Sequence, residues 1–275
     1  MSATPLRLGF SPCPNDTFMV GAWIQGHVGD PGLRVVGVMA DVEELNARAV
    51  EGRDPLEITK LSAAVWPLVR ERYRLLDTGA ALGRGCGPLV VVDASRRTPA
   101  ALCELAGARI AIPGTHTTAW LLLRMFGPPD LRPVPMRFDM VMPAVARGEA
   151  DAGLVIHESR FTYPSFGLRA IADLGELWEG DTGLPLPLGV VAASRALATE
   201  VVTEVSETLR RSIASARKDP ALVWDYVRAH AQEMADDVCR AHVELYVNEF
   251  SVQLGDEGRA AIAELERRAA ATPPG

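Results

Sequence analysis

Apolar runs of strand length alternate with segments of helical spacing in the first part of the chain. Each apolar run is followed by a segment in which apolar residues recur every three or four positions. The predicted strands are Leu6–Phe10, Leu33–Ala40 and Leu56–Thr59, and the predicted helices span residues 16–25, 41–52 and 63–72. Strands this apolar are typical of a mostly parallel sheet that helices cover on both faces.

A glycine-rich stretch, residues 79–88, interrupts this alternation and contains no helix signal. A second series of strands and helices follows it. Its strands are predicted at Leu89–Val92, Arg109–Ile112, Val134–Phe138 and Ala152–Ile156, with helices from Thr117 and over Met140–Arg147. A last strand is predicted at Leu188–Ala192, before helical segments at Thr199–Ala216, Ala221–Ala231, Asp236–Phe250 and Asp256–Ala270.

The two series predict an α/β fold with two lobes and a hinge between them. The chain is expected to cross between lobes near residues 87–92 and again near 186–191. We therefore assign residues 1–90 and 189–275 to lobe one, which includes the C-terminal helices, and residues 91–188 to lobe two. Each lobe is expected to hold a mixed, mostly parallel sheet, with the ligand cleft between the lobes.

The acidic balance of the chain narrows the classes of partner. With 28 Lys and Arg against 35 Asp and Glu, the 275 residues carry a formal net charge of −7 and no basic stripe. Binding of nucleic acid or of an anionic membrane is therefore not expected, and a small anionic substrate must be held by local donors. The four cysteines are widely spaced, and no signal-peptide pattern or membrane-spanning run is present, which favours a cytoplasmic protein.

Polar loops follow several of the predicted strands, where open parallel sheets bind their ligands. After the first strand, prolines fix the backbone and Asn15 can face a ligand, although Asn15 or Asp16 can equally cap the next helix. In the loop 113–118, Thr117 and Thr118 stand at a helix start, where unpaired N–H groups favour an anion. An ordinary threonine cap is the alternative in that loop.

A lysine directly follows the third strand, with no turn residues to lead it away. Lys60 can therefore serve as a counter-charge for a carboxylate at the end of the sheet, and Ser62 can donate to the same ligand or cap the next helix. Leu61 lies between them. The alternative is an exposed lysine on a loop, since lysines lie mostly on protein surfaces.

A histidine follows the strand at 152–156 and opens a loop dense in polar and aromatic residues. His157 is a candidate general base, because the ordinary pKa of histidine lets it take a proton near neutral pH. A structural histidine is the alternative interpretation. The crowding of functional side chains in the next seven residues favours the catalytic one.

Other motifs of catalysis or metal binding are absent from the sequence. Cys239 and His242 share a segment with the pattern of a surface helix and with no further ligands nearby in sequence, so no metal site is predicted. The glycines of Gly83–Gly87 precede a strand, whereas a dinucleotide loop opens a helix. The sequence also lacks HExxH and GxSxG patterns.

These loops together resemble the 1,4-dihydroxy-6-naphthoate synthase family of menaquinone biosynthesis. The similarity extends from about Leu6 to Gly255, although Asp54–Ile58 departs from the plainer strand of the family. The matching stretches are Ser11–Phe18, Thr59–Ser62, Gly83–Gly85, Pro113–Thr118, Ile156–Pro164 and Thr182–Gly189.

The resemblance implies a fold like that of type II periplasmic binding proteins and a lyase activity without a cofactor. The implied reaction converts cyclic dehypoxanthine futalosine to 1,4-dihydroxy-6-naphthoate and dihydroxyacetone. His157 matches the proton acceptor of the family. The implied substrate contacts are Lys60, Leu61, Ser62, Thr117 and Thr118.

Two other functions remain open on the sequence alone. The sister chorismate dehydratase of the same pathway shares the implied fold, and a non-catalytic protein that binds small anions would share it too. The segment His157–Pro164 favours the synthase over both.

Overall fold

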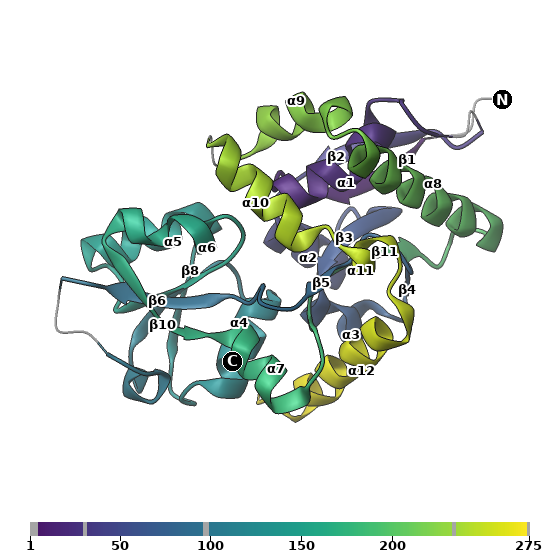
Figure 1. Cartoon of the computed structure of the whole chain (residues 1–275). Helices are drawn as coiled ribbons and strands as arrows, with labels where there is room; N and C mark the ends of the chain where they lie inside the picture. Colours follow the sequence, from purple (N-terminus) through teal and green to yellow (C-terminus); the bar gives the residue numbers. More distant parts are fainter. Residues whose placement is uncertain (1–4, 30–31, 96–98, 233–234, 274–275) are drawn as a thin grey trace.

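Two sheets lie side by side in the computed structural model, which describes residues 5–29, 32–95, 99–232 and 235–273 (Figure 1). The strands are β1 (Leu6–Phe10), β2 (Val35–Met39), β3 (Ile58–Ser62), β4 (Tyr73–Leu75), β5 (Ala81–Gly83), β6 (Leu89–Asp93), β7 (Arg109–Ile112), β8 (Arg132–Pro135), β9 (Ala152–Val155), β10 (Leu168–Asp173) and β11 (Leu186–Ser194). The first sheet has the order β2-β1-β3-β11-β4, with β5 also paired to β11. The second has the order β10-β6-β9-β7-β8. The α/β fold with two lobes is thus confirmed.

Both sheets are mixed, as predicted, but they are less parallel than we expected. In the first sheet β1 is parallel to β2 and β3, whereas β11 is antiparallel to β3, β4 and β5. In the second, β7 is parallel to β8 and β9, whereas β6 is antiparallel to β9 and β10. The antiparallel strands β6 and β11 are the first strands after each change of sheet. They arrive from the other lobe, so no crossover helix forces them parallel to a neighbour.

Helices cover the sheets and bring the last third of the chain back to lobe one. The longer helices are α1 (Pro14–Ile24), α2 (Val42–Glu51), α4 (Thr118–Phe126), α5 (Phe138–Arg147), α7 (Leu174–Thr182), α8 (Thr199–Lys218), α9 (Ala221–His230), α10 (Asp236–Tyr246) and α12 (Gly255–Ala271). The short ones are η1 (Ala63–Val65), α3 (Trp66–Val69), η2 (Leu102–Leu105), α6 (Ser159–Thr162), η3 (Tyr163–Phe166) and α11 (Glu249–Val252). No helix in these described ranges has the length and apolarity that crossing a membrane requires.

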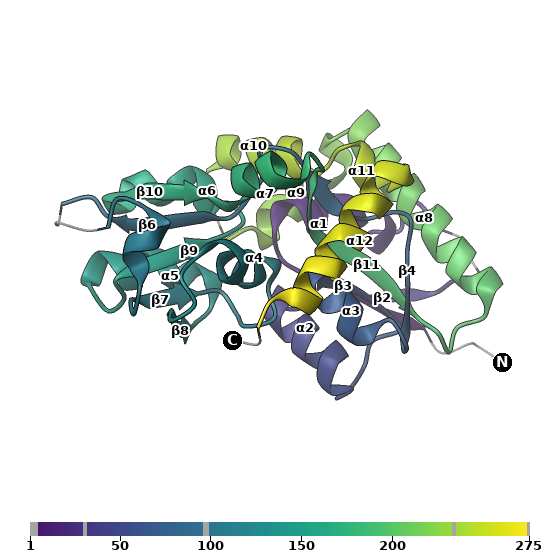
Figure 2. The same cartoon turned by 90° about the horizontal axis from the view of Figure 1, so that it is seen from below.

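The apolar core continues from one lobe into the other. One cluster joins Leu61 and Val190 of the first sheet to Val90 and Ile110 of the second, with Trp178 of α7 among its members. A separate cluster packs α1, α8 and α9 on the other face of the first sheet. The C-terminal helix α12 packs on β11 (Figure 2). Arg268 of α12 forms an ion pair with Asp181 at the end of α7. The lobes are therefore joined on one side of the cleft by buried apolar contacts.

Several predicted elements differ from the structure. The helix expected over 63–72 is a 3-10 turn followed by the single turn of α3, which contains Pro67. The strand expected at Val134–Phe138 ends at Pro135, because Phe138 begins α5. The helix expected over Asp236–Phe250 is two helices, since Asn248 caps α11 with a reciprocal capping box.

The elements β4, β5, β10, α6, η3 and α7 were not predicted. The sheet changes once between β5 and β6 and once between β10 and β11. The lobe boundaries at residues 90 and 188 stay a prediction.

Candidate active site

A cavity opens between the two lobes, and every side chain expected to meet a ligand lies on its wall. It holds about 640 Å³ of empty space, a volume that includes solvent at its open mouth. The expected residues on its wall are Asn15, Lys60, Leu61, Ser62, Thr117, Thr118 and His157. The wall also includes Ser11, Asp16, Cys86, His242 and Tyr246, which come from α1, the loops and α10. Segments far apart in the sequence thus meet at one site.

His157 stands at the end of β9 in a backbone conformation that histidine seldom adopts. Its φ is +56°, in the left-handed region, where a side chain with a Cβ is strained. Its Nε2 is buried and has no hydrogen-bond partner in the described ranges. The edge of the ring meets Phe138, with ring centroids 5.0 Å apart. A strained residue with an unpaired buried nitrogen on a cavity wall is typical of a functional site.

The electrostatic surroundings keep His157 neutral at physiological pH. Burial is the main cause that lowers its pKa below the ordinary 6.5, and the nearby charge of Lys60 adds to this effect. The carboxylates of Asp41 and Asp16 act in the opposite direction. Burial likewise raises the pKa of Asp41, which caps α2 by accepting a hydrogen bond from the Glu43 N–H at 2.9 Å. A neutral imidazole can accept a proton, as a general base must.

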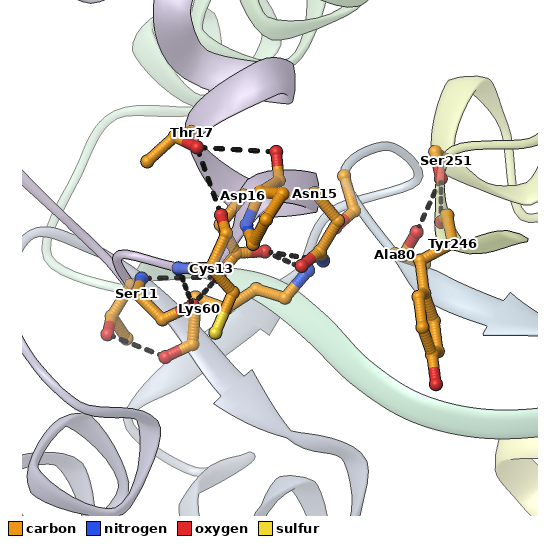
Figure 3. A network of polar contacts seen from close by, with 12 residues as sticks. Ser11, Cys13, Asn15, Asp16, Thr17, Lys60, Ala80, Tyr246 and Ser251 are labelled. Atoms are coloured by element: carbon orange, nitrogen blue, oxygen red, sulfur yellow. Dashed lines mark hydrogen bonds and ion pairs between the residues drawn. The ribbon is translucent and has the colours of Figure 1, made fainter. Parts of the chain in front are cut away.

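Lys60 does not stand as a free counter-charge. Its Nζ lies 3.1 Å from Asp16 Oδ1 and donates to the Gly79 carbonyl at 2.9 Å (Figure 3). The other carboxylate oxygen of Asp16 accepts hydrogen bonds from the backbone and the hydroxyl of Ser11, at 3.1 and 2.7 Å. The lysine and aspartate side chains are 6% and 4% exposed, so this is a buried ion pair with satisfied partners. One N–H of the ammonium is left for a ligand.

The hydroxyl groups of Thr117 and Thr118 are engaged within the protein. Thr117 Oγ1 accepts from the Trp120 N–H and donates to the Gly114 carbonyl, as an N-cap does. Thr118 Oγ1 donates to the carbonyl of Leu188 in β11 and accepts from the N–H of Ala64 in η1, which follows β3. What this helix start offers a ligand is therefore its backbone N–H groups.

Ser62 and Leu61 contribute to the wall in different ways. Ser62 Oγ accepts from Asn46 Nδ2 at 2.9 Å, while Asn46 Oδ1 accepts from the Ser62 N–H at 2.9 Å. The hydroxyl proton of Ser62 is therefore available to a ligand. Leu61 is fully buried and belongs to the core that runs between the lobes.

A carboxylate of lobe one holds the loop that precedes α4. Glu43 of α2 accepts hydrogen bonds from the His116 N–H at 3.0 Å and from the Thr115 hydroxyl at 3.3 Å, and it lies 2.9 Å from His116 Nδ1. Gly114, with φ +148°, leaves room for this contact, since a Cβ there would lie 2.3 Å from Glu43 Cδ. We call this set of contacts the Glu43 latch, and it lies beside the cavity wall formed by Val42 and Thr117.

Sequence reasoning missed His242, which it placed on a surface helix. His242 and Cys239 are both buried, each 1% exposed, because α10 packs against α1 and carries part of the cavity wall. The positions 239, 242, 243 and 246 are buried together on one face of the helix, and that spacing was the available signal. The described residues contain no group of three or more His, Cys, Asp or Glu that could hold a metal ion.

Solved structures from other organisms share this fold. Protein AF1704 from Archaeoglobus fulgidus is 35% identical, with a TM-score of 0.90 and 98% of both chains covered. The alkanesulfonate-binding protein SsuA from Xanthomonas axonopodis pv. citri, bound to MOPS, has a TM-score of 0.68 at 18% identity, covering 99% of this chain and 96% of its own. The likeness to SsuA shows a periplasmic-binding-protein fold and nothing of the ligand.

Sequence comparison identifies the family. A family model described as menaquinone biosynthesis matches residues 6–271. The 1,4-dihydroxy-6-naphthoate synthase of Thermus thermophilus is 51% identical over 272 residues, 98% of this chain and 96% of the relative. The synthase of Streptomyces coelicolor is 46% identical over 278 residues, 98% and 95% of the two chains. The chain therefore belongs to the menaquinone-biosynthesis family, among the 1,4-dihydroxy-6-naphthoate synthases.

Proposed function

We propose that this protein converts cyclic dehypoxanthine futalosine to 1,4-dihydroxy-6-naphthoate and dihydroxyacetone, as a carbon–carbon lyase of menaquinone biosynthesis in the cytoplasm. The observation that carries the proposal is His157, which lies on the wall of a cavity between two lobes and whose buried Nε2 has no hydrogen-bond partner among the described residues. A protein that only binds an anion needs hydrogen-bond donors, and a neutral histidine in a strained backbone adds a base.

The reaction balances with acid–base chemistry alone. His157 takes a proton from a carbon of the fused ring system, and the electron pair of that C–H bond enters the new aromatic ring. The bond to the sugar-derived fragment breaks, the fragment leaves with its electron pair, and a returned proton completes dihydroxyacetone. The two products contain all atoms of the substrate, so the step needs neither oxidant nor reductant.

Aromatisation supplies much of the driving force, which leaves the protein to position the substrate and move the proton. A general base contributes typically about 10²–10⁴-fold to such a step. The start of α4, the Ser62 hydroxyl and the remaining N–H of Lys60 are the donors that we assign to the anionic group of the substrate. Asn15 and Leu61 complete the wall on which the substrate rests.

Separate incubations of the purified protein with cyclic dehypoxanthine futalosine and with chorismate test the proposal. We expect 1,4-dihydroxy-6-naphthoate to form in the first incubation, and chorismate to persist in the second. Loss of chorismate would identify the sister dehydratase instead. Tight binding of either compound with no product would identify a solute-binding protein.

A further inference from the structure

A second histidine, His242, lies on the same cavity wall as His157 and has no role in the proton transfer described above. The two ring centroids are 6.4 Å apart. The ring of His242 also contacts Tyr246, one helical turn further along α10, in a tilted arrangement with a centroid distance of 4.6 Å. Its side chain is 1% exposed, and its Nδ1 has no hydrogen-bond partner in the part of the chain that the structure describes. An unsatisfied buried nitrogen costs free energy unless a ligand completes it.

The hydrogen bonds around Asn15 fix which nitrogen of His242 carries the proton. His242 Nε2 lies 2.9 Å from Asn15 Oδ1, and Asn15 Nδ2 donates to Asp16 Oδ1 at 3.0 Å. A flipped amide would place its oxygen against the carboxylate of Asp16, so the carbonyl oxygen must face His242. Because that oxygen can only accept, Nε2 of His242 must donate.

The remaining nitrogen of His242 is therefore an acceptor. Burial lowers the pKa of His242 well below its ordinary value, and the nearby His157 has the same effect. The ring is thus neutral, and Nδ1 keeps its lone pair. A series of polar contacts thus links Lys60, Asp16, Asn15 and His242 Nε2, and the free lone pair of His242 Nδ1 lies at its end on the cavity wall. Figure 3 shows the part of this chain that joins Asn15, Asp16 and Lys60.

We propose that His242 is a specificity-determining residue that accepts a hydrogen bond from a hydroxyl group of the substrate through Nδ1. The proposal rests on the proposed function, because the substrate of that reaction carries hydroxyl groups on its sugar-derived part. It explains why the pocket presents an acceptor beside its donors. A site of this kind rejects analogues that lack the hydroxyl, since binding them would leave Nδ1 unpaired.

Two substitutions of His242 separate its two nitrogens. Glutamine reaches the position of Nε2, so His242→Gln can still donate to Asn15 but loses the acceptor at Nδ1. Asparagine places its carbonyl oxygen near the position of Nδ1, so His242→Asn keeps an acceptor and loses the contact with Asn15. We expect His242→Gln to raise KM about 10–100-fold with kcat changed less than about threefold, as follows from leaving a buried substrate hydroxyl unpaired. His242→Asn is expected to keep KM within about fivefold of that of the unsubstituted protein, because it loses only the neutral hydrogen bond with Asn15.

Thermal unfolding of both variants distinguishes this role from a structural one. The inference predicts the KM difference between Gln and Asn even where both variants melt at similar temperatures. A KM for His242→Gln equal to that of the unsubstituted protein, or equal KM values for the two variants, would overturn it. If His242→Asn does not fold, the KM of His242→Gln against that of the unsubstituted protein still decides. Absence of turnover in the unsubstituted protein would instead overturn the proposed function, and this inference with it.

Discussion

Two groups of polar side chains meet in the cavity, and they differ in whether the protein itself completes their hydrogen bonds. Around Asp16 and Lys60 each charge has a partner, and the pair is buried from solvent. His157 and His242, whose ring centroids lie 6.4 Å apart, each keep one buried nitrogen without a partner in the described ranges. The first group holds the loop and strand in place and keeps only one N–H of Lys60 for the substrate, whereas the second leaves both of its unpaired nitrogens to the substrate. Residues of one cavity wall can therefore have structural or chemical roles, and the unpaired atoms indicate which.

The largest effect on folding is expected from breaking the Asp16–Lys60 pair. Asp16→Asn leaves the ammonium buried without its counter-charge, so we expect the free energy of unfolding to fall by about 3–5 kcal/mol. Urea titration at neutral pH measures this change. The matched control is Asp54→Asn, because Asp54 pairs with Arg7 but its side chain is 65% exposed, and such pairs contribute less than about 1 kcal/mol. Equal losses in the two variants would show that the buried pair is no more structural than a surface one.

An effect of intermediate size on activity is expected from pH, because pH changes the protonation of His157 in the second group. A general base must be unprotonated, and burial places the pKa of His157 below 6.5. We expect kcat/KM to fall with decreasing pH with a midpoint below pH 6.5, and by about tenfold per pH unit once the base is mostly protonated. This decline is measured by determining kcat/KM between about pH 5 and pH 8, the range in which a histidine titrates. A midpoint above pH 6.5 would contradict the lowered pKa of His157.

The smallest effect is expected at the Glu43 latch, which is partly exposed. Glu43→Gln keeps an oxygen acceptor and loses the charge, so the loop that precedes α4 is held less firmly beside the cavity. We expect KM to rise about two- to fivefold with kcat unchanged, the size of a partly exposed charged contact. Glu44→Gln on the same helix is the control, since Glu44 pairs with the surface residue Arg48. Equal KM values for Glu43→Gln and Glu44→Gln would show that the Glu43 latch does not contribute to substrate binding.

Much of this arrangement could be predicted from the sequence, because it depends on local signals. The apolar runs of β1 and β9 marked the strand ends from which Asn15 and His157 reach the cavity. The third strand was predicted to end at Thr59, but it continues to Ser62, so Lys60 reaches the cavity from within β3 and not from its end. Strands of a sheet present their ends along one edge, so residues far apart in the chain are expected to meet there.

Features set by tertiary contacts could not be predicted in the same way. The hydroxyl of Thr118 forms hydrogen bonds with the backbone of Leu188 and Ala64, and Lys60 forms an ion pair with Asp16. Whether these side chains are free to bind a ligand therefore depends on which distant segments pack against them. His242 was missed for the same reason, since its helix has a polar face and becomes part of the wall only by packing on α1. Short strands such as β4 and β10 have weak patterns of their own and form because a neighbour pairs with them.

The central claim is that His157 is the proton acceptor, and the kcat of His157→Asn tests it most directly. Asparagine tolerates the left-handed backbone at this position, so the fold should survive while the base is lost. We predict that kcat falls about 10²–10⁴-fold, while the melting temperature and the dissociation constant for substrate stay close to those of the unsubstituted protein. His116→Asn, at the partly exposed histidine of the latch, should keep kcat. A kcat for His157→Asn within a few fold of the unsubstituted protein would contradict the account.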